Sequence, residues 1–249
     1  MDNITPAVSA RLRGIVEMSE LDVEALNILR KKIFSRKDVN IEAANREFEW
    51  QAQLLQAGLP PVYWDVEWAK FSGDQKAKGL VKKYCDVLPD ALEAGQGIIF
   101  LGKHGTGKTS LSCLIAKEAL RKGYTVKYFP MMKLLDNILK SFDDKEFKED
   151  LATTVERIEF LIFDDLGKEY LGAKKQLNPM VQLTLDAFLR ERMNRKLVTI
   201  ASTNYDKEAI KDQYGDSVLS VLYGACKFVE VKGEDYRLIR GQEFWDKLK

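Results

Sequence analysis

Histidine and cysteine are scarce in this sequence. Its 249 residues include one histidine, His104, and three cysteines that lie far apart, Cys85, Cys113 and Cys226. Structural zinc and iron sites need several such ligands close together, so this spacing argues against a zinc or iron site. The same spacing predicts three reduced, mostly buried thiols in a cytoplasmic protein.

Long hydrophobic runs and an excess of one charge are also missing. No window approaches the roughly 18 apolar residues of a membrane span, and the N-terminal MDNITPAVSARLRG has no apolar segment behind its charges. We therefore expect neither secretion nor membrane insertion. Lys and Arg number 39 against 38 Asp and Glu, so any binding of a polyanion must come from local patches.

The composition that is present fits one large core with a small appendage, since 45% of the residues are apolar and 31% are charged. The chain changes character at AGLPPVYW, residues 57–64, where Gly58, Pro60 and Pro61 predict a turn. The sequence thus predicts a helical N-terminal arm over residues 1–56 and a main domain over residues 57–249.

The N-terminal arm carries Leu21, Leu26, Leu29 and Ile33 near helical spacing, followed by the charge-rich helix formers ANREFEWQAQLLQAG. A segment this short and polar is not expected to have a core of its own. Two interpretations stay open. The arm either folds back on the main domain or serves as a docking element for a partner.

The main domain alternates apolar runs with helical stretches. The runs GIIFLG (97–102), TVKYF (125–129), FLIFDD (160–165), LVTIAST (197–203) and KFVEV (227–231) predict five buried strands. Strands that alternate with helices indicate an α/β fold, with a parallel five-stranded sheet and helices on both faces.

The stretch LGKHGTGKTS, residues 101–110, predicts a phosphate-binding loop. Residues 102–109 fit G-x-x-x-x-G-K-[ST] between a predicted strand and a helix. Inward backbone N–H groups and the helix N-terminus attract phosphate, Lys108 reaches the β and γ phosphates, and Thr109 can ligate Mg²⁺. His104, at a variable position, is expected to face solvent. The candidate nucleotide-binding residues are Gly102, Lys103, His104, Gly105, Thr106, Gly107, Lys108, Thr109 and Ser110.

Two acidic residues, Asp164 and Asp165, end the run FLIFDD. Carboxylates at the end of a buried strand need compensating charge, which Mg²⁺ and its waters would supply. Many buried strands end in acidic turns, but after a phosphate-binding loop the pair is more specific. We predict Asp164 as the Mg²⁺-side carboxylate and Asp165 as the group that polarises the attacking water.

A third strand ends in Ala201, Ser202, Thr203 and Asn204. If this strand lies beside the strand that precedes the phosphate-binding loop, Asn204 would come near the γ-phosphate and the attacking water. The alternative is an ordinary polar residue in a turn that ends a strand.

These three elements, in this order, resemble the AAA+ ATPases, which have the P-loop NTPase fold. The flanking segments AGLPPVYWD, FDDLG, STN, SVLYGAC and VKGEDYR resemble the DnaC/DnaI-type helicase loaders, a group that also includes the IstB-type transposition ATPases. The resemblance covers roughly residues 57–240. It implies that residues 102–109 are the Walker A loop, Asp164 and Asp165 the Walker B acids, Asn204 sensor 1 and Arg237 a sensor 2 arginine.

The catalytic set that follows from this resemblance is Lys108, Asp165, Asn204 and Arg237. A guanidinium at position 237 would fork onto the γ-phosphate. The alternative for Arg237 is a surface ion pair with Glu234 or Asp235.

The sequence departs from the family pattern at two positions. Asp165 stands where many AAA+ enzymes have Glu, and Val221 stands where relatives often have the arginine that reaches a neighbour's ATP. An arginine supplied in trans is worth about 10³ to 10⁵ in rate. Either Arg190, Arg192 or Arg195 replaces it, or hydrolysis is slow. For each of these arginines taken singly, a solvated helix face is the stronger interpretation.

The resemblance also implies self-association with ATP, a replicative helicase as partner and modest, salt-sensitive binding of single-stranded DNA. Residues 131–150 offer lysines with interleaved aromatics. Residues 30–37, RKKIFSRK, form the densest basic run, which the polar face of the N-terminal helix explains equally well. Acidic neighbours make a solvated helix end the stronger interpretation of the first stretch. The candidate residues for DNA contact in the stretch 131–150 are Lys133, Lys140, Lys145, Lys148, Phe142 and Phe147.

Taken together, these features predict a slow ATPase, stimulated by its partner or by DNA, that helps load a replicative helicase onto single-stranded DNA. Two alternatives remain. One is an IstB-like ATPase that recruits a transposase on duplex DNA, and the other is an ATP-gated scaffold with little turnover, as Val221 favours.

Overall fold

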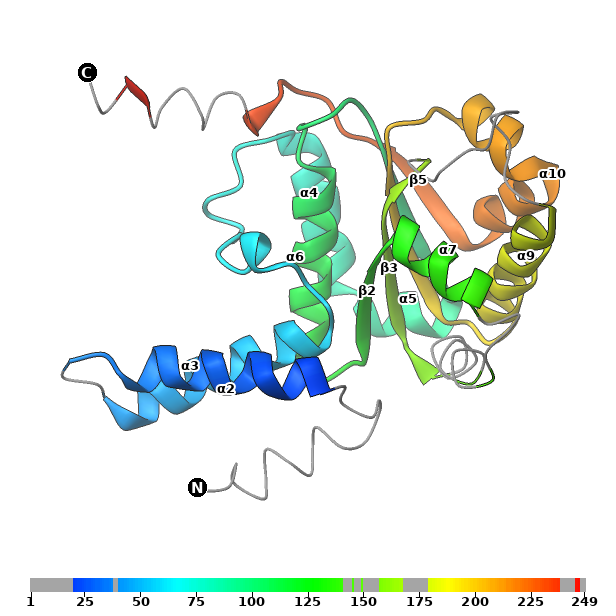
Figure 1. Cartoon of the computed structure of the whole chain (residues 1–249). Helices are drawn as coiled ribbons and strands as arrows, with labels where there is room; N and C mark the ends of the chain where they lie inside the picture. Colours follow the sequence, from blue (N-terminus) through cyan, green and yellow to red (C-terminus); the bar gives the residue numbers. More distant parts are fainter. Residues whose placement is uncertain are drawn as a thin grey trace. The chain divides into compact units, whose positions relative to one another are not determined.

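The computed structural model describes residues 20–37, 40–140, 145, 149, 157–167, 179–237 and 245–246. The chain divides into two compact units, unit 1 (Met1–Trp64) and unit 2 (Asp65–Lys249), whose elements are labelled in Figure 1. The boundary predicted from sequence, between residues 56 and 57, and this division differ by the turn segment 57–64.

Unit 1 contains a helical hairpin of α2 (Glu20–Phe34) and α3 (Ile41–Gln56), followed by the short 3₁₀ helix η1 (Pro61–Tyr63). The Asn40 side chain caps α3 by accepting a hydrogen bond of 3.0 Å from the N–H of Ala43. The apolar residues of both helices recur at helical spacing and form a cluster of their own: Leu26, Leu29, Ile33, Ala44, Phe48 and Ala52. The expectation that this region has no core is therefore wrong, because pairing two helices buries stripes that neither could bury alone.

Unit 2 is built on a parallel five-stranded sheet in the order β2-β3-β4-β1-β5. The strands are β1 (Gly97–Leu101), β2 (Val126–Pro130), β3 (Phe160–Leu166), β4 (Val198–Thr203) and β5 (Cys226–Glu230). The five strands predicted from sequence are confirmed, with bounds that agree to within one residue.

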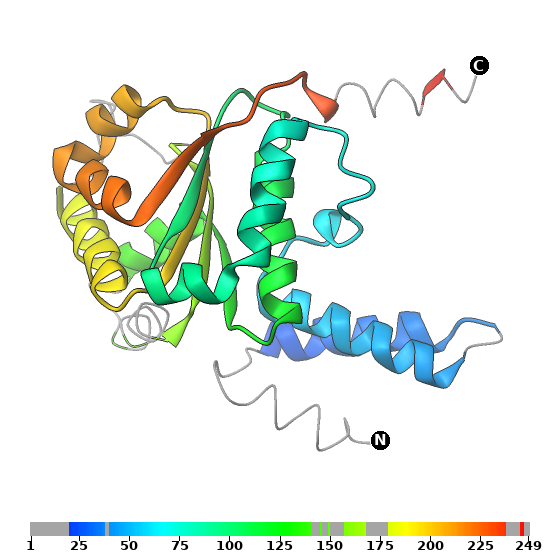
Figure 2. The ribbon, with the colours of Figure 1, turned by 180° about the vertical axis from the view of Figure 1, so that it is seen from behind.

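Helices cover both faces of this sheet (Figures 1 and 2). They are α4 (Gln75–Asp86), α5 (Leu88–Ala94), α6 (Lys108–Arg121), α7 (Met131–Lys140), α9 (Pro179–Asn194) and α10 (Lys207–Ala225). α7, α9 and α10 lie on one face, and α4 and α6 lie on the other. The predicted α/β architecture is thus confirmed.

The alternation of side chains along the strands fills both layers. Ile99, Leu161 and Ala201 belong to one cluster with apolar residues of α7, α9 and α10, while their neighbours along the strands point to the opposite face. β1 lies inside the sheet, between β4 and β5. The loop that follows β1 lies at the carboxyl edge of the sheet, where ligands of such folds bind. Within the described parts of the chain, no helix has the length and apolar character needed to cross a membrane.

Candidate functional site

The loop between β1 and α6 is shaped by glycines that no larger residue could replace. Gly102 has a φ of 146°, and a Cβ there would lie 2.4 Å from the carbonyl oxygen of Val231. Gly105 has a φ of 71°, and its Cβ would lie 1.8 Å from the Asp235 carboxylate. The loop therefore needs glycine both for its backbone conformation and for its close packing.

Lys108 begins α6 and is buried, with 5% of its surface exposed. Its ammonium donates hydrogen bonds to the carbonyl oxygens of Gly102 (2.8 Å) and Lys103 (2.6 Å) and to Oδ1 of Asn204 (2.8 Å). The positive charge is thus held at the inner side of the loop, where it adds to the partial positive charge of the α6 N-terminus. His104 is exposed, as predicted.

Asp164 lies at the end of β3 and is 7% exposed. Its Oδ1 accepts hydrogen bonds from the hydroxyls of Thr109 (2.9 Å) and Ser202, and its Oδ2 accepts one of 2.6 Å from the hydroxyl of Tyr128. Three hydroxyl donors therefore compensate the buried carboxylate. The charge is also felt by Cys113, whose pKa is raised by burial and, to a smaller extent, by Asp164.

Asp165 follows at an irregularity of the sheet. The pairing of β3 with β4 shifts register between Phe163 and Leu166, and Asp165 has a φ of 62°, which is uncommon for a residue other than glycine. Its backbone N–H donates a hydrogen bond of 3.1 Å to Oγ of Ser202. The irregularity thus falls on the two consecutive acidic residues, and the Ser202 hydroxyl forms a hydrogen bond with each of them.

Asn204 directly follows β4, which pairs with β1 in parallel. The sequence argument required these two strands to be neighbours, and they are. The 2.8 Å contact with Lys108 places the Asn204 amide at the mouth of the phosphate-binding loop.

The segment after β5 crosses the same loop. The N–H of Val231 donates to the carbonyl oxygen of Leu101 (2.7 Å), and the N–H of Tyr236 donates to that of Gly105 (3.1 Å). Arg237 therefore lies one residue beyond a direct contact with the loop, and it is exposed. Among the described residues, no ion pair joins Arg237 to Glu234 or Asp235, the alternative that the sequence left open.

The three arginines considered as substitutes at Val221 have different surroundings. Arg192 is fully buried and donates to the carbonyl oxygens of Ile158 (2.9 Å) and Val198 (2.7 Å), and burial lowers its pKa to about 9. It cannot reach a neighbouring molecule, so Arg192 is excluded.

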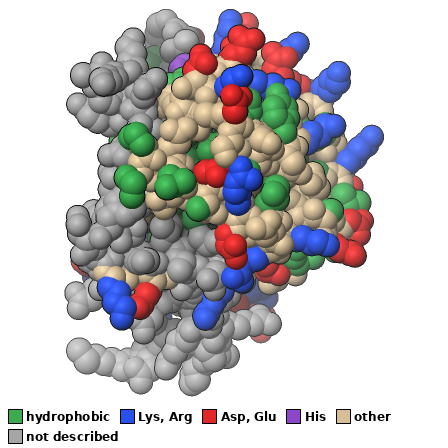
Figure 3. All heavy atoms as spheres, turned by 90° about the vertical axis from the view of Figure 1, so that its right-hand side faces the viewer, with side chains coloured by type: hydrophobic (Ala, Val, Ile, Leu, Met, Phe, Trp, Pro, Cys, Tyr) green, Lys and Arg blue, Asp and Glu red, His purple; other side chains and the backbone are tan. Residues whose placement is uncertain are grey.

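Arg190, on α9, and Arg195, one residue beyond the end of α9, are both exposed. Figure 3 shows acidic and basic side chains interspersed over one side of the molecule. Arg195 pairs with Glu191 at 2.6 Å. Arg190 pairs with Asp186 and donates to Ser217 of α10, one helical turn before Val221. Val221 itself is buried in the core.

The residues considered for DNA contact are only partly described. Lys133 is exposed on α7, and Lys145 is exposed and forms an ion pair with Glu149. The side chain of Lys140, and the residues Lys148, Phe142 and Phe147, lie outside the described residues. In unit 1, the Arg36 guanidinium donates two hydrogen bonds to Glu47, which neutralises part of the basic run 30–37.

Sequence reasoning missed Tyr128 and the role of Ser202 at this site. Tyr128 lies in no recognised motif, and Ser202 lies in the segment STN, in which only Asn204 was given a role. The available signal was a hydroxyl-bearing residue in each of two apolar strands, which the sequence alone does not connect to Asp164. The carboxyl edge of the sheet therefore gathers Lys108, Thr109, Asp164 and Asn204 as expected, together with these two further hydroxyls.

This arrangement suits a hydrated Mg²⁺ bound to phosphate. The Thr109 hydroxyl and the Asp164 carboxylate lie 2.9 Å apart, and both are hard oxygen donors. Mg²⁺ in nucleotide sites is held by one or two such groups, with phosphates and water as its remaining ligands. The residues that would hold it are Thr109 and Asp164.

Several known proteins are similar to this chain in sequence. YdaV, an uncharacterized protein of Escherichia coli (strain K12), is 22% identical over 199 residues, which are 79% of this chain and 78% of YdaV. The replicative helicase loader DnaC of the same strain is 20% identical over 228 residues, 89% of each chain. The ATP-binding protein of insertion sequence IS21 of Pseudomonas aeruginosa is 26% identical over 152 residues, 59% of this chain and 54% of that protein.

Solved structures show the same fold. The crystal structure of the DnaC helicase loader superimposes with a TM-score of 0.59 at 22% identity, covering 70% of this chain and all of that one. The replication initiator DnaA bound to AMPPCP and single-stranded DNA gives a TM-score of 0.57 at 20% identity, over 71% of this chain and 51% of DnaA. The fold is thus the P-loop AAA+ fold that the sequence predicted.

A family model described as IstB-like ATP binding protein matches residues 36–243, which include the phosphate-binding loop, both acidic residues and Asn204. Since this match covers most of the sequence, the chain belongs to the family of IstB-like ATP binding proteins.

Proposed function

We propose that this protein binds ATP with Mg²⁺, hydrolyses it slowly to ADP and phosphate, and uses the cycle to help load a replicative helicase onto single-stranded DNA in the cytoplasm. The observation that carries the ATPase proposal is the meeting of Lys108, Thr109, Asp164 and Asn204 at one edge of the sheet. These groups come from the phosphate-binding loop and two separate strands.

Each group has a role in the proposed reaction. Lys108 binds the β and γ phosphates. Asp165 polarises the water that attacks the γ-phosphorus while the bond between that phosphorus and ADP breaks. Asn204 orients that water beside Lys108. Arg237, which follows the loop contact of Tyr236, forks onto the γ-phosphate. Bound Mg²⁺ would neutralise charge that develops on the phosphate oxygens.

The surroundings of the candidate arginines on α9 and of Val221 on α10 support slow turnover. Val221 is buried, Arg192 is excluded and Arg195 is paired with Glu191. Arg190 beside Ser217 is the remaining candidate for a group supplied to a neighbouring copy in an ATP-dependent oligomer. Even so, its guanidinium would first have to leave Asp186.

The helicase-loading part of the proposal rests on the likeness to DnaC, which covers 89% of each chain. That match omits only about a tenth of this chain, so it extends into unit 1, which contains the arm considered as a docking element for a partner. The second candidate is transposase recruitment on duplex DNA, which is supported by the likeness to the IS21 protein. That relative is more identical than DnaC, but its match covers a shorter part of the chain.

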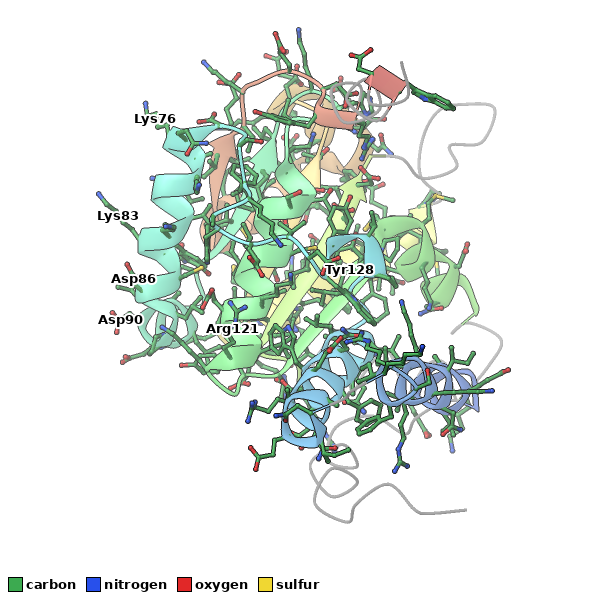
Figure 4. All side chains as sticks on the ribbon, turned by 90° about the vertical axis from the view of Figure 1, so that its left-hand side faces the viewer. Lys76, Lys83, Asp86, Asp90, Arg121 and Tyr128 are labelled. Carbon is green, nitrogen blue, oxygen red and sulfur yellow. The ribbon has the colours of Figure 1, made fainter. Side chains whose placement is uncertain are left out.

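One assay tests the first candidate directly. The full chain is added to a bacterial replicative helicase on single-stranded DNA circles carrying an annealed strand, and strand displacement is measured with the wild type, Lys108→Ala and Lys83→Ala. Lys83 points outward from α4 and serves as the control (Figure 4). Helicase loading predicts stimulation that Lys108→Ala abolishes and Lys83→Ala keeps.

Absence of stimulation by the wild type would contradict helicase loading. A parallel binding assay on single-stranded and duplex DNA, with and without ATP at low salt, then distinguishes the two candidates. Preference for single strands with ATP supports loading, and ATP-dependent assembly on duplex supports the IS21-like role.

A further inference from the structure

The hydrogen bond between Tyr128 and Asp164 is the feature of this site that no sequence motif explains. Tyr128, labelled in Figure 4, lies on β2 and is 4% exposed. Its hydroxyl donates a hydrogen bond of 2.6 Å to Oδ2 of Asp164. The other oxygen of this carboxylate, Oδ1, accepts from Thr109 and Ser202. Thr109 and Ser202 therefore bond to one oxygen of the carboxylate, and Tyr128 bonds to the other.

The sheet register explains why this donor is a tyrosine. Tyr128 pairs with Ile162, and Pro130 pairs with Asp164, so Tyr128 is a diagonal neighbour of Asp164 on the same face. A diagonal neighbour on the next strand is farther away than the residue directly opposite, so the long tyrosine side chain suits this contact better than the short side chain of serine or threonine. A tyrosine at this position brings a hydroxyl to Oδ2.

Bonds to both oxygens fix the rotation of the carboxylate. With Oδ1 alone restrained, the carboxylate plane could turn about its last bond, which has a broad torsional preference. Mg²⁺ demands near-ideal octahedral geometry, so the direction of a ligating carboxylate matters. Hydrogen bonds to metal ligands from outside the coordination sphere typically change metal affinity by about 10- to 100-fold.

We propose that Tyr128 is a positioning residue for the Mg²⁺–nucleotide site, acting by holding the Asp164 carboxylate in the orientation that binds Mg²⁺. The inference rests on the proposed nucleotide site. It assigns Tyr128 no contact with ATP, so the residue acts only through Asp164. ATP without Mg²⁺ is then bound equally well with or without the Tyr128 hydroxyl.

The test measures binding of ATP to the full chain by calorimetry, first in EDTA and then across a Mg²⁺ titration. Tyr128→Phe removes the hydroxyl and keeps the ring. We expect its ATP affinity in EDTA to stay within about twofold of wild type, and the Mg²⁺ concentration for half-maximal enhancement to rise by about 10-fold or more.

Tyr84→Phe is the matched control. The Tyr84 hydroxyl also donates a 2.6 Å hydrogen bond, to the carbonyl oxygen of Gln96, but it does not contact Asp164. Tyr84→Phe should leave the Mg²⁺ midpoint unchanged. Tyr128→His, which keeps a ring N–H donor, should shift the midpoint less than Tyr128→Phe, and it replaces that variant if its melting curve shows no folded state.

Three outcomes decide the matter. A Mg²⁺ midpoint that shifts only in the Tyr128 variants supports the inference. Equal midpoints in Tyr128→Phe and wild type, or an equal loss of ATP affinity with and without Mg²⁺, overturn the inference alone. If the wild type binds no ATP under either condition, the nucleotide site fails and the inference fails with it.

Discussion

The Lys108 ammonium and the Asn204 side-chain oxygen lie 2.8 Å apart, although 96 positions separate them in the sequence. The contact exists because β1 and β4 are adjacent and parallel, so the loop after one strand meets the residue after the other. The lysine proposed to bind phosphate and the amide proposed to orient water thereby lie side by side.

Asn204→Ala should slow hydrolysis more than it weakens ATP binding. Removing a group that orients the attacking water costs on the order of 10²-fold in rate, while the ammonium and the loop still hold phosphate. Single-turnover hydrolysis and equilibrium ATP binding separate the two effects. Asn194→Ala, at the exposed end of α9, is the control. An Asn204→Ala rate equal to wild type would remove Asn204 from the proposed mechanism.

Asp165→Asn tests whether turnover matters for function. Neutralising the group that polarises water should lower hydrolysis by roughly 10²- to 10⁴-fold and leave Mg²⁺-ATP binding near wild type. The helicase assay is then repeated with this variant. If stimulation persists without hydrolysis, the protein works as an ATP-gated scaffold, and if stimulation is lost, the cycle requires turnover.

Arg192→Met should destabilise the fold strongly. Arg192 satisfies the buried carbonyl oxygens of Ile158 and Val198, and each unsatisfied buried acceptor costs about 1–3 kcal/mol. We expect a loss of at least roughly 2 kcal/mol in the free energy of unfolding, measured by urea denaturation. Arg195→Met removes only an exposed ion pair and should change stability by about 0.5 kcal/mol or less. Equal effects of the two variants would contradict a structural role for Arg192.

Ionisation of the Cys85 thiol should lower the free energy of unfolding at alkaline pH. Burial raises its pKa to about 12, so the folded thiol stays protonated while the unfolded thiol ionises above its ordinary value. The folded state then binds more protons, and stability falls as pH rises through the range between the two values. At pH 10.5 the effect amounts to roughly 2 kcal/mol relative to neutral pH.

The measurement compares urea unfolding of wild type and Cys85→Ala at several pH values from 7.5 to 10.5. Subtracting the free energy of unfolding of the variant from that of wild type removes the contribution of the other titrating groups, because both proteins share them. The stability of wild type relative to the variant should decline with pH, and a constant difference would show that the folded thiol ionises normally.

Local patterns in the sequence determined much of this protein. Apolar runs of strand length between helical stretches predicted the five strands of the sheet to within one residue, because each run had to be buried on both faces. The phosphate-binding loop was predictable for a related reason. Its glycines, Lys108 and Thr109 are consecutive, so their chemistry follows from the chain itself.

Only the tertiary structure decided which distant residues complete the site. The sheet order put Tyr128 beside Asp164 and Asn204 beside Lys108, and the burial of Arg192 removed one candidate that the sequence had kept. The pairing of α2 with α3 likewise gave unit 1 a core that neither helix has alone. The spacing of residues along a strand or helix is set locally, whereas the neighbours of a strand and the depth of a side chain are set by how the whole sheet is assembled.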